Sequence, residues 1–376
     1  PKLLAAIPQG ENQLRLIFDE RLERDLPSVN AFAINPVQEV VRVDFLNESL
    51  RDLLLTVATT FQPSLRYTIT VNQLRDCSGN RIQDDYRSAI FGLPEVSEAG
   101  DVVINELLFN PRPFGVDFIE LYNRSAKFIN LKNWSIGNFQ NGVSANLRVV
   151  TDDDLLFPPD SYLAFTIDPF NIRANYPLAK MEQVIQVSAL PAFPDNDGTA
   201  CVISERGVLL DFFSYNRDFH SVFLRDREGV SLERISATGS STDRNNWKSA
   251  ASTVGFATPG YRNSNSVNRE EEEGEVTVVP EIFIPLFGQP DFTEIRYAFQ
   301  QGGRVANIRV LDHQGREIRK IANNELLATE GFFRWDGDRD DGTKARPGYY
   351  FVWFELFDAN GIVQTYRKRV VIAARY

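Results

Sequence analysis

Histidine is the side chain most often used for acid–base catalysis and for metal binding at neutral pH, and this chain has two, His220 and His313. His220 lies in the segment DFHSVFLRD, where Asp218 and Ser221 could complete a general base and a nucleophile. Neighbours in sequence need not meet in space, so we favour a structural histidine there. His313 lies in a predicted turn, where a solvated residue is favoured.

Motifs that carry enzyme chemistry are missing from the sequence. It has no nucleophile elbow, no HExxH motif, no Cys/His metal set and no phosphate-binding glycine loop. Together with the two histidines, this favours a non-enzymatic protein without catalytic residues or cofactors. A hydrolase that uses Asp or Glu side chains and a bound metal stays open as an alternative.

One acidic cluster has the spacing of a calcium loop. Asp336, Asp338 and Asp340 follow a D-x-D-x-D pattern, and calcium prefers several carboxylate and carbonyl oxygens. However, Gly342 comes one residue later than in an EF-hand, and no Glu follows at the bidentate position. We therefore favour a hairpin loop, and keep the three aspartates as the candidate Ca²⁺ ligands.

A second pair of carboxylates, Asp117 and Glu120, lies in a predicted strand. Their odd spacing places them on opposite faces, because side chains alternate along a strand. They are not expected to form the carboxylate pair of a glycosidase on their own.

Four tryptophans could line a glycan-binding platform: Trp134, Trp247, Trp335 and Trp353. Trp335 and Trp353 lie in apolar strand patterns, and the other two lie in motifs discussed below. Core packing is the favoured interpretation for all four.

Composition limits the class of protein. Hydrophobic residues make up 43% and charged residues 24% of the 376 residues, as in folded chains. The net charge is −11, which argues against a nucleic-acid partner or a polybasic membrane anchor. No apolar run reaches the roughly 18 residues of a transmembrane helix. The chain begins at Pro1 without a charged and then apolar leader, so we expect a processed or trimmed start.

The two cysteines, Cys77 and Cys201, fall in different predicted modules. We favour two buried free thiols, since unpaired cysteine packs like a small hydrophobic residue. An inter-domain disulfide in an oxidising compartment is the alternative, and the sequence does not decide whether the two cysteines pair.

Residues 1–96 alternate in the manner of a first β-sandwich. Three apolar sets are expected to face its core: Leu14, Leu16 and Phe18; Val41, Val43 and Phe45; and Tyr67, Ile69 and Val71. A turn is expected at Ser78-Gly79-Asn80, which needs residues that tolerate a positive φ.

Residues 98–266 form the second predicted module. Strands are expected at Val102–Leu108 and Asp117–Tyr122, joined by a Pro/Gly loop. Asn141–Pro194 is read as extended connections with one short helix near Pro169–Tyr176. A hairpin should follow, turning at Glu205–Gly207.

An acidic linker and a third sandwich complete the chain. The segment Asn263–Glu275, with its acidic part at 267–275, contains four consecutive glutamates that repel one another, so we expect it to be solvated and extended. Residues 276–376 are predicted to fold as the third sandwich, with Ala306, Ile308 and Val310 facing its core. Its turns are expected at His313–Gly315 and Asn360-Gly361.

Several sequence motifs of the second module resemble those of a known family. The segments INE-L-FNP and DF-ELYN at 104–123, GVSLERI at 229–235, NW at 246–247 and ATPGYRNS at 257–264 are similar to those of the lamin-tail domain in its Bacteroidetes form. The resemblance covers about 98–266. It implies an immunoglobulin-like sandwich that serves as a binding or spacer module.

The flanking modules resemble other families. LRLIFDERL near the start and RYTITVNQLRDCSGNRI are similar to the bacterial Ig-like domain of surface-layer proteins. FFRWDGDRDDGTKARPGYYFVWFEL resembles the FlgD-type Ig-like fold, and its position after an acidic linker resembles the sorting domains of type IX secretion.

These observations together predict an all-β protein of three tandem Ig-like sandwiches from a Bacteroidetes-like bacterium. We expect a non-catalytic adhesion, structural or binding module, extracellular or on the outer-membrane surface. Its partners would be a protein or glycan at the cell surface, contacted through the long loops of 141–194, and possible outer-membrane components of type IX secretion. A carbohydrate-binding accessory region of a larger secreted hydrolase is the alternative.

Overall fold

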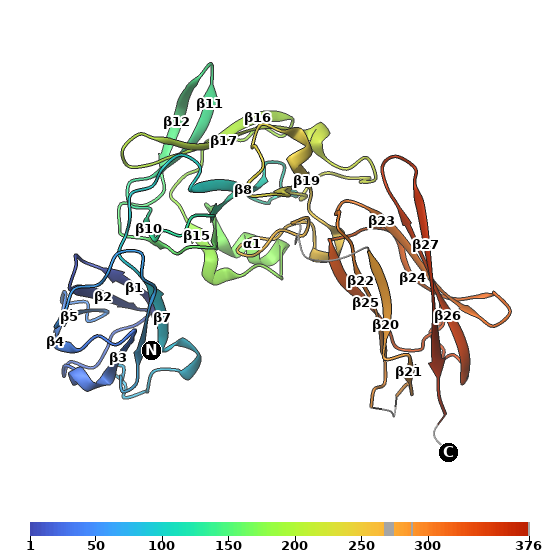
Figure 1. The fold of residues 1–376 in the computed structure, drawn as a ribbon, viewed down its shortest axis with the longest axis horizontal. Coiled ribbons are helices and arrows are strands. Elements are labelled where there is room, and N and C mark those ends of the chain that lie inside the picture. Colours follow the sequence, from blue (N-terminus) through green and yellow to red (C-terminus); the bar gives the residue numbers. More distant parts are fainter. Residues whose placement is uncertain (267–273, 287–288, 375–376) are drawn as a thin grey trace.

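The computed structural model describes residues 1–266, 274–286 and 289–374 (Figure 1). Strands account for 45% of the chain and helices for 7%, so the predicted all-β fold is confirmed. Three groups of sheets follow one another along the chain, here called the N-terminal, middle and C-terminal sandwiches. The exact domain boundaries stay a prediction.

The N-terminal sandwich packs a four-stranded sheet against a three-stranded one. The sheets consist of β1 (Leu3–Pro8), β2 (Gln13–Phe18), β5 (Asp52–Val57) and β4 (Val40–Phe45), and of β3 (Phe32–Asn35), β6 (Tyr67–Val71) and β7 (Ser88–Phe91). Strand alternation sends every second apolar side chain into the space between them.

Most of the predicted alternation in this sandwich is confirmed. The set on β2 and the set on β6 are buried at 0–1% exposure. The exception is Val41, which is 50% exposed, whereas Val40 and Val43 are buried. The pairing of β4 with β5 shifts between Val40 and Arg42, and such a bulge moves one residue to the other face.

The middle sandwich contains a six-stranded and a four-stranded sheet. The six-stranded sheet runs β15 (Val184–Gln186), β14 (Ser161–Thr166), β9 (Phe118–Asn123), β8 (Val102–Leu108), β18 (Leu232–Arg234) and β19 (Trp247–Ser249). The other runs β12 (Val143–Val149), β11 (Ser135–Gln140), β16 (Asp197–Ile203) and β17 (Leu209–Asn216), and β10 (Ile129–Asn130) pairs with β13 (Leu156–Phe157).

The reading of 141–194 as extended connections was wrong. Four strands lie in this stretch, and β14 pairs with β9 over six residues. The predicted short helix is confirmed as α1 (Pro169–Asn175), whose first amides are capped by the Asp168 carboxylate. Prolines and aspartates at the strand ends gave this region its loop-like appearance. The hairpin of β16 and β17 turns at Glu205–Gly207 as expected.

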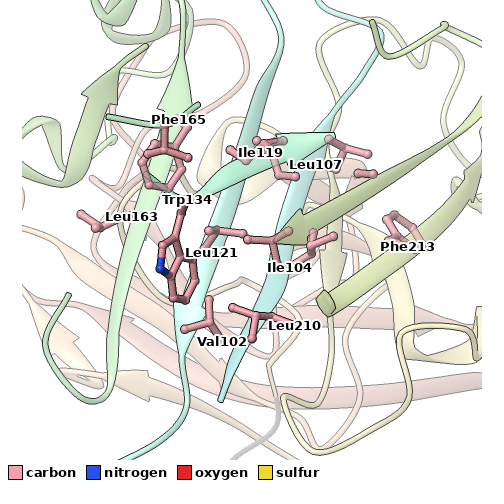
Figure 2. Close-up of a cluster of buried hydrophobic side chains, with 14 of the residues drawn as sticks. Val102, Ile104, Leu107, Ile119, Leu121, Trp134, Leu163, Phe165, Leu210 and Phe213 are labelled. Atoms are coloured by element: carbon pink, nitrogen blue, oxygen red, sulfur yellow. The ribbon is translucent and has the colours of Figure 1, made fainter. Parts of the chain in front are cut away.

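The core of the middle sandwich lies between its two sheets. Figure 2 shows Leu107, Ile119 and Leu121 of β8 and β9 facing Trp134 and Phe213. Trp134 and Leu121 are at most 1% exposed. Burial of side chains this large contributes about 1.5–3 kcal/mol each, so this face of the sheet fixes the relative position of β8 and β9.

The C-terminal sandwich pairs a three-stranded sheet with a five-stranded one. Its strands are β20 (Glu275–Val279), β22 (Thr293–Ala298) and β25 (Glu330–Trp335), and β21 (Ile282–Phe283), β27 (Val363–Ile372), β26 (Gly348–Phe357), β23 (Val305–Asp312) and β24 (Glu317–Leu326). The inward set predicted on β23 is confirmed at 0% exposure.

The short 3-10 helices lie in the connections of the N-terminal and middle sandwiches. They are η1 (Val29–Ala31), η2 (Asp84–Tyr86), η3 (Met181–Gln183), η4 (Arg217–Phe219), η5 (Arg244–Asn246) and η6 (Ser252–Val254).

The segment predicted as a linker begins as part of the fold. Asn263, Ser264 and Asn265 are at most 7% exposed, because they hydrogen-bond to side chains of the middle sheet. The four glutamates of the predicted acidic linker, 270–273, lie outside the described residues. In the described part of the chain, no helix is long and apolar enough to cross a membrane.

Candidate functional site

His220 does not form a triad with its sequence neighbours. Its ring is 3% exposed, and Nδ1 lies 3.0 Å from the hydroxyl of Ser249, not of Ser221. Burial, followed by the charges of Arg227 and Arg217, lowers the His220 pKa to about 4. Asp218 instead pairs with Arg227 at 3.3 Å. The arrangement is that of a neutral, buried histidine.

The three candidate calcium ligands each contact a different cation. Asp336 pairs with Arg334 at 2.6 Å, Asp338 with Lys344 at 2.6 Å and Asp340 with Arg319 at 3.6 Å. Their loop joins β25 to β26 (Figure 1). Within the described ranges, no group of three or more His, Cys, Asp or Glu side chains is arranged to hold a metal ion.

The tryptophans separate into two kinds. Trp134, Trp247 and Trp335 are buried, and their indole N–H groups donate to protein oxygens at 2.9–3.0 Å. The prediction of core packing was wrong for Trp353. Its neighbours Val352 and Phe354 point inward, so Trp353 lies on the outer face, where the Arg367 guanidinium stacks 4.2 Å from its ring centroid.

Both cysteines are free thiols, as favoured, but only one is buried. Cys201 is 0% exposed and its thiol donates to the Asn138 carbonyl at 3.3 Å. Cys77 is exposed, because it lies in the turn before Gly79. The expectation that both would be buried was therefore wrong for Cys77.

The strongest concentration of chemistry in the described chain is a row of three buried glutamates in the six-stranded sheet. Glu120 of β9 lies opposite Glu106 of β8, and Glu106 lies opposite Glu233 of β18. Residues in register on adjacent strands share a face, and all three are 0% exposed. We call Glu106, Glu120 and Glu233 the glutamate row.

The segment 256–266 covers the glutamate row and supplies most of its hydrogen bonds. Glu106 accepts from the Thr258 amide at 2.9 Å and from the Ser231 hydroxyl. Glu120 accepts from the Gly260 amide at 2.6 Å and from the Asn105 side chain at 2.8 Å.

Glu233 has the largest set of donors. The amide and hydroxyl of Ser264 donate to it at 3.1 and 2.8 Å, and the amide and side chain of Asn265 donate at 3.0 and 2.7 Å. These hydrogen bonds to a carboxyl group replace the water that burial removes, which is the condition for keeping such groups in a core. Segment 256–266 is thereby fixed on the sheet.

The protonation of the three glutamates depends on their burial and on the short distances between them. Burial and then the charge of Glu233 raise the Glu106 pKa to about 8. Burial also raises the pKa of Glu120 well above its ordinary value, and that of Glu233. Three adjacent buried carboxylates cannot all ionise without partners of opposite charge. Burial and the neighbouring carboxyl groups thus favour the protonated form of Glu106.

Asp117, which was not expected to pair with Glu120, lies outside the row. Burial and the nearby charge of Asp195 raise the Asp117 pKa to about 7. Its backbone carbonyl accepts from the Thr166 hydroxyl at 2.9 Å. The row therefore joins Glu120 to Glu106, a residue that the sequence analysis did not single out.

A signal for the row was present in the sequence. The fragments INEL, IELY and SLER each place one glutamate next to a leucine in a strand-like segment. A glutamate in a strand buried on both faces needs internal donors, and the TPGYRNSN segment contains several. The sequence alone does not give the strand register that brings the three glutamates side by side.

Part of the middle sandwich matches a known family. Residues 95–217 match the Lamin Tail Domain family. The match contains β8 and β9, with Glu106 and Glu120. The strand that carries Glu233 and the segment 256–266 lie beyond the matched residues, yet they complete the same sheet and close its outer face. The matched region is thus continuous with further structure at its C-terminal side.

Other comparisons are distant. No curated protein matches the chain. The surface-layer protein structure rSbsC(31-844) shares 11% identity over 99% of this chain and 54% of its own, with a TM-score of 0.23. Dimeric latent PorU from Porphyromonas gingivalis shares 11% over 100% of this chain and 34% of its own, with a TM-score of 0.22. CopC from Methylosinus trichosporium OB3b shares 16% over 28% of this chain and 100% of its own, with a TM-score of 0.20. TM-scores this low do not establish a shared overall structure.

Proposed function

We propose that this chain is a non-catalytic, exported module that binds a protein or glycan at a bacterial cell surface. The lamin tail domain would hold the binding surface, and the flanking sandwiches would position it. In this proposal the glutamate row is structural, because its carboxyl groups are enclosed by the chain's own donors and have no exposed oxygen-bearing surface for a substrate.

The observation that carries the proposal is the β11–β12 hairpin, which projects from the middle sandwich (Figure 1). β12 is an edge strand, and it exposes three apolar side chains: Val143 by 62%, Leu147 by 42% and Val149 by 46%. Proteins generally protect exposed apolar edge strands because these pair with other chains. Such an edge is suited to binding a partner strand or an apolar surface.

Hydrogen bonds between the middle and C-terminal sandwiches support a role as a stiff spacer. The Ser252 hydroxyl contacts the Glu325 carboxylate at 2.7 Å and the Leu326 carbonyl at 2.9 Å. The Thr329 amide donates to the Ser264 carbonyl at 2.8 Å. These bonds join the middle and C-terminal sandwiches directly, so displacement of one relative to the other would break them.

The binding proposal is tested with labelled protein on intact cells of the source bacterium. We expect saturable binding that falls at least about ten-fold, or roughly 1.4 kcal/mol, when Val143, Leu147 and Val149 are all changed to Ser. The matched control changes three other exposed apolar residues to Ser: Val37, Val41 and Leu65. Equal binding by both variants would reject the hairpin as the contact surface.

The finer proposal is that residues 276–376 serve as a type IX sorting domain in a Bacteroidetes-like host. Deleting this sandwich should abolish surface display, whereas deleting residues 1–96 should leave it. Normal display without 276–376 would refute the sorting role.

The carbohydrate-binding alternative loses its original support. Trp134 and Trp247, the expected platform residues, are buried in the core of the middle sandwich. Hydrolase assays with and without added divalent ions test the non-catalytic part of the proposal. Turnover, or a stoichiometric transition metal in the purified protein, would contradict it.

A further inference from the structure

A hollow of about 390 Å³ lies where the middle and C-terminal sandwiches meet. Residues 219–222 and 244–249 line one side, and residues 301–304 and 358–360 line the other. In Figure 1 the tip of the β26–β27 hairpin approaches the part of the chain around β19. This hollow is remote from the β11–β12 hairpin, so what it binds is independent of the function proposed above.

Three cationic side chains line this hollow, in a chain whose net charge is −11: Arg244, Lys248 and Arg304. Each has a neutral partner. Arg244 donates to the Asp218 backbone carbonyl at 2.7 Å, and Lys248 donates to the Gly302 carbonyl at 2.7 Å. Arg304 lies 5.9 Å from the centroid of the Phe299 ring. Among the ion pairs of the described residues, none involves these three cations.

The acidic side chain on the lining is already engaged. Asp358 Oδ1 accepts from the amides of Asn360 and Ile362 at 2.9 and 2.8 Å, which holds the turn of the hairpin. Asp358 makes no ion pair with Arg304 or Lys248 within the described ranges. Asp358 forms no ion pair there among the described residues and offsets at most one of the three positive charges, so the lining keeps a net positive charge.

The charged form of Lys248 is destabilised at this hollow. Partial burial, and then the charge of Arg304, lower the Lys248 pKa. A lysine ammonium carries three N–H donors, and the structure assigns one of them to Gly302. An anion between Lys248 and Arg304 would offset their repulsion and use the remaining donors.

A second polar group at the hollow lacks a partner. His220 lines the hollow and is 3% exposed, and its Nε2 atom has no hydrogen-bond partner among the residues that the structure describes. Buried ring nitrogens are normally hydrogen-bonded. An unsatisfied histidine beside uncompensated cations is typical of a site that receives a polar ligand.

We propose that this hollow binds an oxyanion group on a molecule of about the size of a monosaccharide, with Lys248 and Arg304 as its charged contacts. The volume exceeds that of a bare ion, since one water occupies about 30 Å³ of liquid. The amide side chain of Asn360 and the backbone of Gly303 line the same space and could contact hydroxyl groups.

The test uses the whole chain and isothermal titration calorimetry with glucose 6-phosphate at low salt, with glucose as the neutral probe. We expect 1:1 binding of glucose 6-phosphate and none of glucose. Arg304→Gln should weaken binding at least about ten-fold, as loss of a charge-assisted hydrogen bond does. Arg304→Lys should restore most of the affinity, because the charge remains.

A matched control removes the same charge elsewhere. Arg24 is exposed and lies in the N-terminal sandwich, so Arg24→Gln should bind as the wild type does. The thermal midpoint of each variant shows whether it is folded, and Lys248→Met provides a second loss-of-charge variant if Arg304→Gln unfolds. Absence of binding to the wild type, equal binding of glucose, or unchanged affinity in the loss-of-charge variants would overturn the proposal.

Discussion

Glu106 and Glu233 share one hydroxyl group: Thr258 Oγ1 lies 3.0 Å from Glu106 Oε2 and 2.9 Å from Glu233 Oε1. A hydroxyl has one hydrogen, so it can donate to only one of the two carboxyl groups. The other contact requires a proton on the carboxyl group itself. Burial raises the pKa of both Glu106 and Glu233, so one of these two carboxyl groups holds the proton, and we test Glu106 first.

Glu106→Gln tests this proton directly. The Gln amide has the shape of a protonated carboxyl group and can donate to Thr258 in its place, so we expect a folded variant. In the wild type the folded pKa of about 8 exceeds the ordinary 4.5. The native state then holds a proton that the unfolded chain loses. Stability from this group is complete below pH 4.5 and falls as the pH rises towards 8.

The measurement is urea unfolding at several values between pH 5 and pH 8. The free energy of unfolding of the wild type should decrease over this window, and the slope should be shallower in Glu106→Gln. Glu120 and Glu233 have pKa values shifted in the same direction, so some slope will remain. Identical slopes in the two proteins would show that Glu106 is ionised in the native state.

Glu233→Ala removes an acceptor and leaves five donor groups of Thr258, Ser264 and Asn265 without their partner. Each buried donor left unpaired costs about 1–3 kcal/mol, so a loss of at least about 3 kcal/mol in the free energy of unfolding is expected. The exposed Glu48→Ala is the control and should change it by less than about 0.5 kcal/mol. A loss below about 1 kcal/mol for Glu233→Ala would mean that the segment is not held by this residue.

The two thiols should react at very different rates. Burial raises the Cys201 pKa to about 11, so this thiol is protonated at pH 7 and also inaccessible. Cys77 is exposed. Titration with a maleimide should modify one thiol per chain under native conditions and two in denaturant. Two fast equivalents in the native protein would contradict the packing around Cys201.

Leu121→Ala should destabilise the middle sandwich by about 2–5 kcal/mol, the usual range for a leucine removed from a core. Leu121 is 0% exposed and lies in the cluster of Figure 2. Leu178→Ala, at a position 57% exposed in the same sandwich, serves as the control and should stay within about 0.5 kcal/mol. Chemical denaturation followed by tryptophan fluorescence measures both.

Much of the fold could be predicted from local patterns. Alternation placed Leu16 and Ile69 in the core, and the glycines of the turns predicted several hairpins, since Gly361 and Gly315 take φ values near +80°. Local patterns fail where a bulge changes the alternation, as at Val41, or where an aromatic residue lies on an exposed strand face, as Trp353 does.

The glutamate row could not be predicted, for a physical reason. Glu106 and Glu120 lie on consecutive strands, but Glu233 joins them through a pairing with Glu106 across more than 100 positions of the chain, which local patterns do not specify. Residues 263–266 were included in the predicted linker because they precede four consecutive glutamates, which repel one another. The role of Ser264 and Asn265 as donors to Glu233 depends on a partner that the local sequence does not contain.

The central claim is that the glutamate row is an enclosed structural element that fixes segment 256–266 on the sheet. Hydrogen exchange of the amides of Thr258, Gly260, Ser264 and Asn265 tests it most directly, because each donates to a buried carboxyl group. We predict protection comparable to that of β8, reflecting global unfolding. Exchange of these amides as fast as in exposed loops, while β8 stays protected, would contradict the claim.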